Sequence, residues 1–261
     1  MSPEELAAAG LRLEIESQLA TLTLDRPASR NSQTPAMWRA LAEVGSGLPD
    51  DVRAVVVRGA GPAFSAGLDR SMLDPTTSGE ETVAALLAQD DDAISATIDE
   101  YQRGFTWLRD PRFVSIAAVQ GYAIGAGFQL ALACDLRLLA DDAQLCMKEP
   151  ALGLVPDLTG TKPLVECVGY ARALEICATA RMVGAAEAVE IGLALAAVPA
   201  AELDGTVADL VAALTAAPVG AVRETKSLLL GAAQHDLDTQ RRLEREAQVR
   251  RFRELMALLG T

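Results

Sequence analysis

Two glycine-rich loops, each directly after an apolar segment, constrain the fold of this chain most. The first segment, residues 52–58, reads VRAVVVR and runs into GAGPAFSAGLD. The second, residues 113–119, reads FVSIAAV and runs into QGYAIGAG. Short apolar segments rich in β-branched residues predict buried strands. The chain is therefore predicted to form an α/β fold in which both loops leave buried strands.

The second loop leads into FQLALACD, which predicts a short buried helix, and then into LRLLA, which predicts another strand. A glycine turn before a helix exposes backbone N–H groups that lack internal acceptors, and these groups can bind a phosphate or stabilise an oxyanion. The alternative is that the glycines only permit a tight turn and close packing. Two such loops favour an oxyanion site, whereas GYAIGAG lacks the GxGxxG spacing of a dinucleotide-binding domain.

The remaining sequence predicts a strand–helix core followed by helices. Residues 11–24 alternate like a hairpin, and Thr34 with Pro35 marks the start of a helix. Further helices are expected at 93–109, 159–168, 170–180, 185–191, 200–215, 218–231 and 236–258, with a short strand within 193–198. We divide the chain into a core, 1–195, and a C-terminal helical region, 196–261. The last helix carries an apolar stripe suited to subunit contact, formed by Leu243, Ala247, Phe252 and Leu255.

Composition excludes several classes of function. The net charge of −13 argues against a general nucleic-acid surface. The chain has no uninterrupted stretch of about 18 apolar residues, so no membrane span is predicted. The acidic N-terminus does not resemble a signal peptide, and we therefore expect a cytoplasmic protein. The acidic run at 90–92 is expected to be a solvated face. Buried free thiols are expected at Cys134, Cys146, Cys167 and Cys177.

The single histidine, His235, limits the available chemistry. A multi-histidine metal site is excluded, and we expect no metal. His235 lies in QHDLD, which is typical of a helix start. Acid–base chemistry must then come from carboxylates, lysine or tyrosine.

Four segments in order carry a family resemblance: LDRPASRNS, RGAGPAFSAGLD, AAVQGYAIGAGFQLALACDLRLL and KEPALGLVPDLTGT. Over residues 12–195 the chain resembles the crotonase superfamily, or enoyl-CoA hydratase/isomerase family. The resemblance implies a crotonase-like spiral of ββα units with a C-terminal helical trimerisation region. It also implies a homotrimer or homohexamer and an acyl-CoA thioester as substrate. No separate cofactor is implied, because coenzyme A is part of the substrate.

The resemblance also implies site residues. The backbone N–H groups of Leu68 and Ala126 would hold the thioester oxygen, and Glu149 would carry the proton. The family usually has glycine where this chain has Ala126, but alanine keeps the N–H. Both donors would stabilise an enolate formed from the thioester, and losing one such donor typically costs about 3–4 kcal/mol in the barrier. Further substrate contacts are implied for Arg26, Ala28, Ala66, Gly67, Asp69 and Gly125.

The main departure from the family is Gln129, which stands where hydratases have a second glutamate. Glutamine cannot accept a proton as a general base. We therefore slightly prefer double-bond isomerisation by one carboxylate, and Asp157 matches an acid of dienoyl-CoA isomerases. A hydratase or a non-catalytic acyl-CoA-binding homologue are the alternatives.

Each of these polar residues also has a purely structural interpretation. Glu149 would then be a surface acid, and Gln129 a buried amide bonded to backbone. Asp157 would then be the N-cap of helix 159–168.

Overall fold

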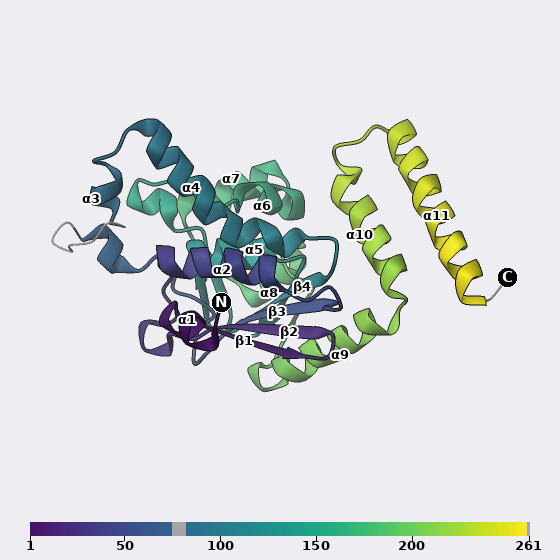
Figure 1. The fold of residues 1–261 in the computed structure, drawn as a ribbon. Coiled ribbons are helices and arrows are strands. Elements are labelled where there is room, and N and C mark those ends of the chain that lie inside the picture. The colour runs from purple at the N-terminus through teal and green to yellow at the C-terminus, as the bar shows by residue number, and fades with distance from the viewer. Residues whose placement is uncertain (75–81, 260–261) are drawn as a thin grey trace.

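A computed structural model describes residues 1–74 and 82–259 of the chain (Figure 1). Its main sheet has six strands in the order β1-β2-β3-β4-β6-β9. The first two strands form the predicted antiparallel hairpin, and every later strand pairs in parallel. The strands are β1 (Leu11–Glu16), β2 (Leu19–Leu24), β3 (Ala54–Gly59), β4 (Val114–Val119), β6 (Leu136–Ala140) and β9 (Ala196–Val198).

The central strands β3 and β4 are apolar except for Arg58 and Ser115, because both faces of the sheet are covered. Val55 and Val57 face the larger core, beneath α2 (Pro35–Gly47) and α5 (Ala126–Ala133). The alternate residue Val56 faces a second apolar cluster beneath α9 (Leu203–Ala216). Burying each such side chain contributes about 1.5–3 kcal/mol, so the alternation fixes the register of the sheet between its two helical layers.

A second, smaller sheet holds the glycine loops. It consists of β5 (Tyr122–Ile124), β7 (Gln144–Cys146) and β8 (Val183–Gly184), in that order. An isolated bridge between Ser65 and Ala123 joins the first glycine loop to this sheet. These strands are two or three residues long, which is too short to give a periodic sequence signal.

Helix starts follow local capping chemistry. The Thr34 side chain accepts a hydrogen bond from the Met37 N–H at 3.3 Å, which confirms the predicted start of α2. Asp90 caps α4 (Asp91–Thr106) by accepting from the Ala93 N–H at 2.8 Å. The acidic run 90–92 therefore forms a helix start, where negative charge is favourable.

The remaining short helices lie at α1 (Pro3–Ala8), α3 (Val83–Leu86), α6 (Thr161–Val168), α7 (Tyr170–Thr179) and α8 (Ala185–Glu190). Short 3₁₀ turns lie at Pro27–Ser29, Arg70–Leu73, Trp107–Arg109, Glu149–Leu152 and Ala200–Glu202. The predicted loop between residue 71 and α4 lies partly outside the described residues, because 75–81 are not included.

The last two helices, α10 (Val219–Ala232) and α11 (Leu237–Leu259), form a hairpin that extends away from the core (Figure 1). Asp236 caps α11 by accepting from the Thr239 N–H at 2.7 Å, so His235 lies just outside this helix. The division at residue 195 stays a prediction. In space, β9 belongs to the main sheet, and α9 covers a face of that sheet.

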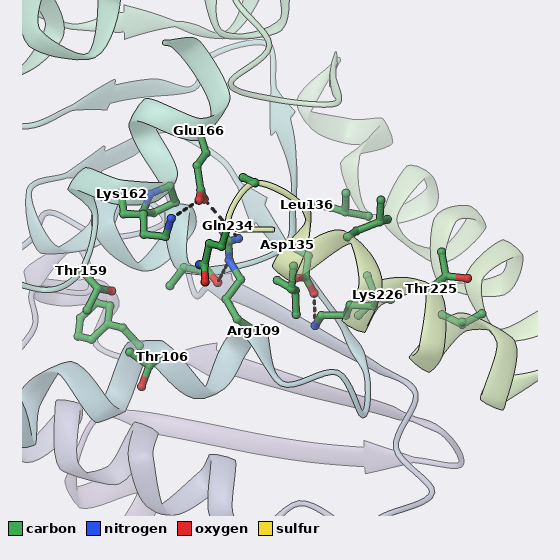
Figure 2. A pocket seen from close by; sticks show the side chains of 18 of the residues that line it. Thr106, Arg109, Asp135, Leu136, Thr159, Lys162, Glu166, Thr225, Lys226 and Gln234 are labelled. Atoms are coloured by element: carbon green, nitrogen blue, oxygen red, sulfur yellow. Dashed lines mark hydrogen bonds and ion pairs between the residues drawn. The ribbon is translucent and has the colours of Figure 1, made fainter. Parts of the chain in front are cut away.

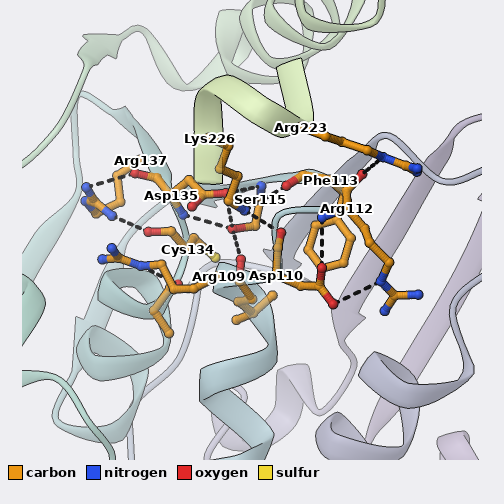
Figure 3. Close-up of polar contacts among 12 residues, drawn as sticks. Arg109, Asp110, Arg112, Phe113, Ser115, Cys134, Asp135, Arg137, Arg223 and Lys226 are labelled. Atoms are coloured by element: carbon orange, nitrogen blue, oxygen red, sulfur yellow. Dashed lines mark hydrogen bonds and ion pairs between the residues drawn. The ribbon is translucent and has the colours of Figure 1, made fainter. Parts of the chain in front are cut away.

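A buried polar cluster, which we call the Lys226 cluster, anchors α10 to the core (Figure 3). The Lys226 ammonium donates at 2.7 Å to the carbonyls of Asp110 and Phe113 and to Asp135 Oδ2. Ser115 Oγ completes the cluster by donating to Asp135 Oδ2 at 3.1 Å. All three ammonium protons therefore have acceptors, although Lys226 is only 8% exposed.

In the parts of the chain that the structure describes, no single helix is both long and apolar enough to cross a membrane. Residues Ala200–Ala216 and Val219–Ala232 meet that test only as a pair, and the pair is bent by 103°. All four cysteines are free thiols. As predicted, Cys134 and Cys146 are buried, whereas Cys167 and Cys177 are half-buried. Burial raises the pKa of the Cys134 thiol to about 12.

Candidate active site

The two glycine loops meet directly, as their sequence predicted. The Ser65 N–H donates to the Tyr122 carbonyl at 2.8 Å, and the Ile124 N–H donates to the Ser65 carbonyl at 3.0 Å. Gly67 has a φ of +84°, and a Cβ there would lie 2.4 Å from the Ile124 carbonyl oxygen. The same Cβ position is 3.5 Å from the Ala126 nitrogen. Only glycine allows this approach, which brings the Leu68 segment beside the start of α5.

Leu68 and Ala126 are the two residues whose N–H groups were predicted to form an oxyanion hole. Ala126 is the first residue of α5, so its N–H has no acceptor within the helix. Leu68 forms an isolated bridge with Gln33, which uses the N–H groups of Gln33 (to Gly67 O, 2.7 Å) and Asp69 (to Gln33 O, 2.8 Å). The Leu68 N–H stands outside that bonding pattern. The loops thus bring two backbone donors into one region.

Gly125 connects these donors to the candidate acid–base residue. Its φ of +52° and ψ of −119° are accessible to glycine and strained for other residues. A Cβ at Gly125 would lie 3.1 Å from Glu149 Oε1 and 3.7 Å from Oε2. The carboxyl group of Glu149 therefore lies against the residue that immediately precedes Ala126.

Glu149 is not the surface acid of the structural alternative. It begins a 3₁₀ turn, Glu149–Leu152, and is 9% exposed. Burial raises the pKa of its carboxyl group. Its own backbone N–H and a hydrogen bond from Gln129 oppose that rise, and the nearby charge of Asp157 adds to it. Oε2 is buried without a hydrogen-bond partner among the described residues. The carboxyl group of Glu149 thus combines a raised pKa with one oxygen, Oε2, that has no hydrogen-bond partner among the described residues.

Gln129 is fully buried on α5 and uses both ends of its amide. Nε2 donates to Glu149 Oε1 at 2.7 Å. Oε1 accepts from the N–H groups of Leu158 at 2.9 Å and Gly160 at 3.2 Å. The alternative of a buried amide bonded to backbone is confirmed, and the amide also contacts the candidate catalytic carboxyl. Sequence alone gave no sign of this second contact.

Asp157 does not cap the following helix. The N-cap of α6 is Gly160, and no side chain accepts a hydrogen bond there, so the capping alternative is wrong. The residue is exposed as a whole, whereas protein atoms crowd its carboxyl group, and this burial raises the pKa. Its carbonyl accepts from Gln102 Nε2 of α4 at 2.7 Å. Both carboxyls therefore have raised pKa values, and the charge of Asp157 adds to the rise at Glu149.

Arg26 is not an ordinary exposed arginine after a strand. Its Nη1 donates to the Ser32 carbonyl at 2.6 Å, and its Nη2 lies 3.0 Å from Asp69 Oδ2. Burial acts to raise the pKa of Asp69, but hydrogen bonds from Ser71, Ser32 and Arg26 outweigh it and lower that pKa to about 2. These contacts hold the loop that follows Leu68.

The other predicted substrate contacts lie on the same loops. Ala28 is part of the 3₁₀ turn Pro27–Ser29, and the Ala66 N–H donates to the Arg30 carbonyl at 2.8 Å. Contact of Arg26, Ala28, Ala66, Gly67, Asp69 and Gly125 with a substrate stays a prediction.

A buried polar network that sequence analysis missed supports the first glycine loop. Gln33 Nε2 donates to Ser65 Oγ at 3.1 Å, and Gln33 Oε1 accepts from Trp38 Nε1 at 2.8 Å. Ser65 Oγ donates to the Asn31 carbonyl at 2.7 Å. The only signal was the polar run NSQ after a strand, which also suits an ordinary loop. The network rigidifies the segment that carries Leu68.

A separate groove of about 1170 Å³ lies between α10 and the core (Figure 2). Its walls include Phe105, Leu136, Pro163, Leu229 and Leu230. Lys162 pairs with Glu166 at its edge at 2.6 Å. Neither Glu149 nor Gln129 is among the lining residues, so this groove is distinct from the carboxyl site.

Comparison with known proteins agrees with this architecture. The sequence model described as enoyl-CoA hydratase/isomerase matches residues 14–257. A Clostridium acetobutylicum short-chain-enoyl-CoA hydratase is 30% identical over 90% of this chain and 86% of its own length. The (E)-benzylidenesuccinyl-CoA hydratase of Thauera aromatica is 32% identical over 69% of this chain and 66% of its own length.

A solved structure extends the similarity to the whole fold. A Thermobifida fusca protein in complex with acetoacetyl-CoA superposes with a TM-score of 0.93 at 56% identity, covering 97% of this chain and 98% of that one. The fold is thus the crotonase fold with C-terminal helices. The chain belongs to the enoyl-CoA hydratase/isomerase family and is an enzyme of that family. Both of these relatives carry the name of a hydratase.

Proposed function

We propose that the enzyme binds an enoyl-CoA thioester and stabilises its enolate with the N–H groups of Leu68 and Ala126. Glu149 then moves the proton at the carbon beside the thioester carbonyl. One observation carries this proposal: the Glu149 carboxyl lies against Gly125, the residue before Ala126. Proton carrier and oxyanion donor are therefore neighbours. The acetoacetyl-CoA complex of the Thermobifida fusca protein supports a thioester ligand.

The chemistry follows from electrostatics. Two fixed N–H donors draw electron density onto the thioester oxygen, which makes the adjacent carbon more acidic. Loss of one such donor typically costs about 3–4 kcal/mol in the barrier. The raised pKa of Glu149 brings its carboxyl closer to the operating pH, where a group exchanges protons most efficiently.

Hydration of a 2-enoyl-CoA is the first candidate reaction, and the names of the two hydratase relatives support it. Water adds to the carbon two removed from the carbonyl, and the adjacent carbon gains a proton. Glu149 can supply that proton. Gln129 cannot take the proton that water loses, so Asp157, whose charge acts on Glu149, is our candidate for the second carboxylate.

Movement of the double bond between 2-enoyl- and 3-enoyl-CoA is the second candidate. It is favoured by the hydrogen bonds of Gln129, which already binds Glu149 and two backbone N–H groups. This reaction needs one carboxylate that removes a proton from one carbon and returns it to another. Glu149 Oε2 is available for both steps.

Incubation with 2-enoyl- and 3-enoyl-CoA thioesters of several chain lengths distinguishes the candidates. Gain of one water, detected by mass spectrometry, would support hydration. Migration of the double bond without added water would support isomerisation. Glu149→Gln is the control and is expected to slow the formation of either product about 10²–10⁴-fold. Tight binding of every thioester without turnover would contradict the proposal.

We also propose a homotrimer or homohexamer. The α10–α11 hairpin extends from the core (Figure 1). Three of its apolar residues, Val249, Phe252 and Leu255, are 47%, 57% and 50% exposed. The groove beneath α10 adds a second apolar surface. Light scattering coupled to size exclusion should give the mass of a trimer or hexamer, and Phe252→Glu should reduce it. A monomeric wild type would contradict this assembly.

The four free thiols suit a reducing compartment, and we propose a cytoplasmic location.

A further inference from the structure

The orientation of the Gln129 amide is determined by its surroundings. The N–H groups of Leu158 and Gly160 can only donate, so the oxygen of the amide must face them. The amide NH₂ must then face Glu149 Oε1, 2.7 Å away. A flipped amide would place donors against donors, and so the hydrogen-bond network settles the assignment of oxygen and nitrogen.

This orientation has a consequence for the two oxygens of Glu149. Oε1 accepts the Nε2–H of Gln129, which directs a lone pair of that oxygen towards the amide. Oε2 has no partner among the described residues. When Glu149 takes up a proton, Oε2 is therefore the oxygen that receives it. The two oxygens are chemically distinct before any substrate binds.

The same amide also holds the loop that carries Asp157. Thr159 has a φ of +69°, which is strained for a β-branched residue. A Cβ at Gly160 would lie 2.6 Å from Gln129 Cγ, so the turn packs closely on the glutamine. Oε1 of Gln129 bonds the N–H groups on both sides of Thr159. Loss of the glutamine would thus release the turn next to Asp157.

We propose that Gln129 is a positioning residue that assigns proton exchange to Oε2 of Glu149 and fixes loop 157–160 against the same carboxyl. The part played by Oε2 in turnover rests on the proposed function. The fixed carboxyl itself does not, and it is measurable in the unliganded protein.

The test combines two measurements on Gln129→Met, Gln129→Glu and a control. Carbon-13 NMR titration of glutamate-labelled, unliganded protein reports the ionisation of Glu149, and its resonance is identified by its loss in Glu149→Gln. The pH dependence of kcat/KM with the best thioester reports the same group in turnover. Gln120→Met is the matched control, because the Gln120 amide also bonds the backbone, its Nε2 donating to the Gly59 carbonyl at 2.7 Å, but makes no hydrogen bond to Glu149 in the described parts of the chain.

Gln129→Met removes a donor to the charged carboxylate, so the Glu149 titration midpoint is expected to rise by about one pH unit, with the acidic limb of kcat/KM following it. Gln129→Glu keeps acceptors for the Leu158 and Gly160 N–H groups, which protects the turn. It places a second carboxyl against Oε1, so the two carboxyls share a proton and the midpoint rises further. Gln120→Met is expected to move neither midpoint.

An unchanged Glu149 midpoint in both Gln129 variants would overturn the inference, whatever happens to turnover. A shifted midpoint in a protein whose wild type turns over no thioester would instead contradict the proposed function and leave the positioning of the carboxyl supported. The two failures are thus distinguishable.

Discussion

The Lys226 cluster and the Glu149–Gln129 pair each bury an ionisable group. They differ in whether every polar atom of that group has a hydrogen-bond partner. Every proton of the Lys226 ammonium has an acceptor, whereas Oε2 of Glu149 has none among the described residues. A fully paired buried charge holds two elements together, and an incompletely paired one costs stability and stays reactive. The comparison supports an anchoring role for Lys226 and the proton exchange that we propose for Glu149.

Burial shifts both groups towards their neutral forms. It lowers the pKa of Lys226, although Asp135 opposes that shift, and it raises the pKa of Glu149. The ion pair with Asp135, at 2.7 Å, keeps Lys226 a structural cation. Glu149 has no cation beside it in the described contacts, so the same desolvation prepares it to exchange a proton.

Replacing Glu149 should have the largest effect on activity and little effect on the fold. Glu149→Gln keeps the size of the side chain and an acceptor for Gln129 Nε2, so the fold should persist. Turnover of any enoyl-CoA substrate should fall about 10²–10⁴-fold, because no proton carrier remains at this position. Steady-state kinetics with circular dichroism checks both points. Retention of most of the activity would mean that another group moves the proton.

The same variant has a pH signature in stability. Burial raises the pKa of Glu149 above its unfolded value of about 4.3, so its stabilising contribution is complete below that pH and is lost as the pH rises through the raised pKa. A glutamine does not titrate. The Tm of Glu149→Gln relative to wild type should therefore increase from about pH 4 to about pH 8, and a constant difference would contradict this.

Replacing Lys226, in contrast, should mainly lower the stability of the fold. Lys226→Met leaves Asp135 without its cation and should cost about 3 kcal/mol in the free energy of unfolding. Lys162→Met is the control, because its ion pair with Glu166 involves a side chain that is 65% exposed and should contribute less than about 1 kcal/mol. Chemical denaturation measures both. Equal losses would show that the Lys226 cluster is no anchor.

The smallest change is expected from Asp157→Asn. It removes the negative charge that raises the pKa of Glu149. The acidic limb of kcat/KM should therefore move to lower pH, by less than about one unit. Asp99→Asn on the exposed face of α4 is the control, and its profile should match wild type. A profile for Asp157→Asn that also matches wild type would place Asp157 outside the reach of Glu149.

Sequence predicted those parts of the fold whose determinants are local. The strands before the glycine loops follow from continuous apolar segments, and the start of α2 follows from Thr34 and Pro35. The meeting of the two loops followed from their order, and Glu149 from the family resemblance. The strands and the start of α2 can each be recognised from a short stretch of neighbouring residues, whereas the other two features needed the order of several motifs along the chain.

The remaining features depend on residues far apart in the chain. Lys226 resembles a surface lysine of an amphipathic helix, and its partner Asp135 lies 91 positions earlier. The contacts of Gln129 reach Glu149, 20 positions later, and Gly160, 31 positions later. No periodicity or propensity encodes such contacts, because the tertiary packing of the loops creates them. The capping role considered for Asp157 was wrong because α6 begins only at Thr161, with Gly160 as its N-cap.

The amide at position 129 has an evolutionary consequence. Codons for glutamine and glutamate differ only in their first base, so a single base substitution would introduce a carboxyl group at this position. The N–H groups of Leu158 and Gly160 that now bind the amide oxygen could bind a carboxylate oxygen without moving. A lineage carrying this scaffold could therefore gain or lose a second acid in one step while its loops stay in place.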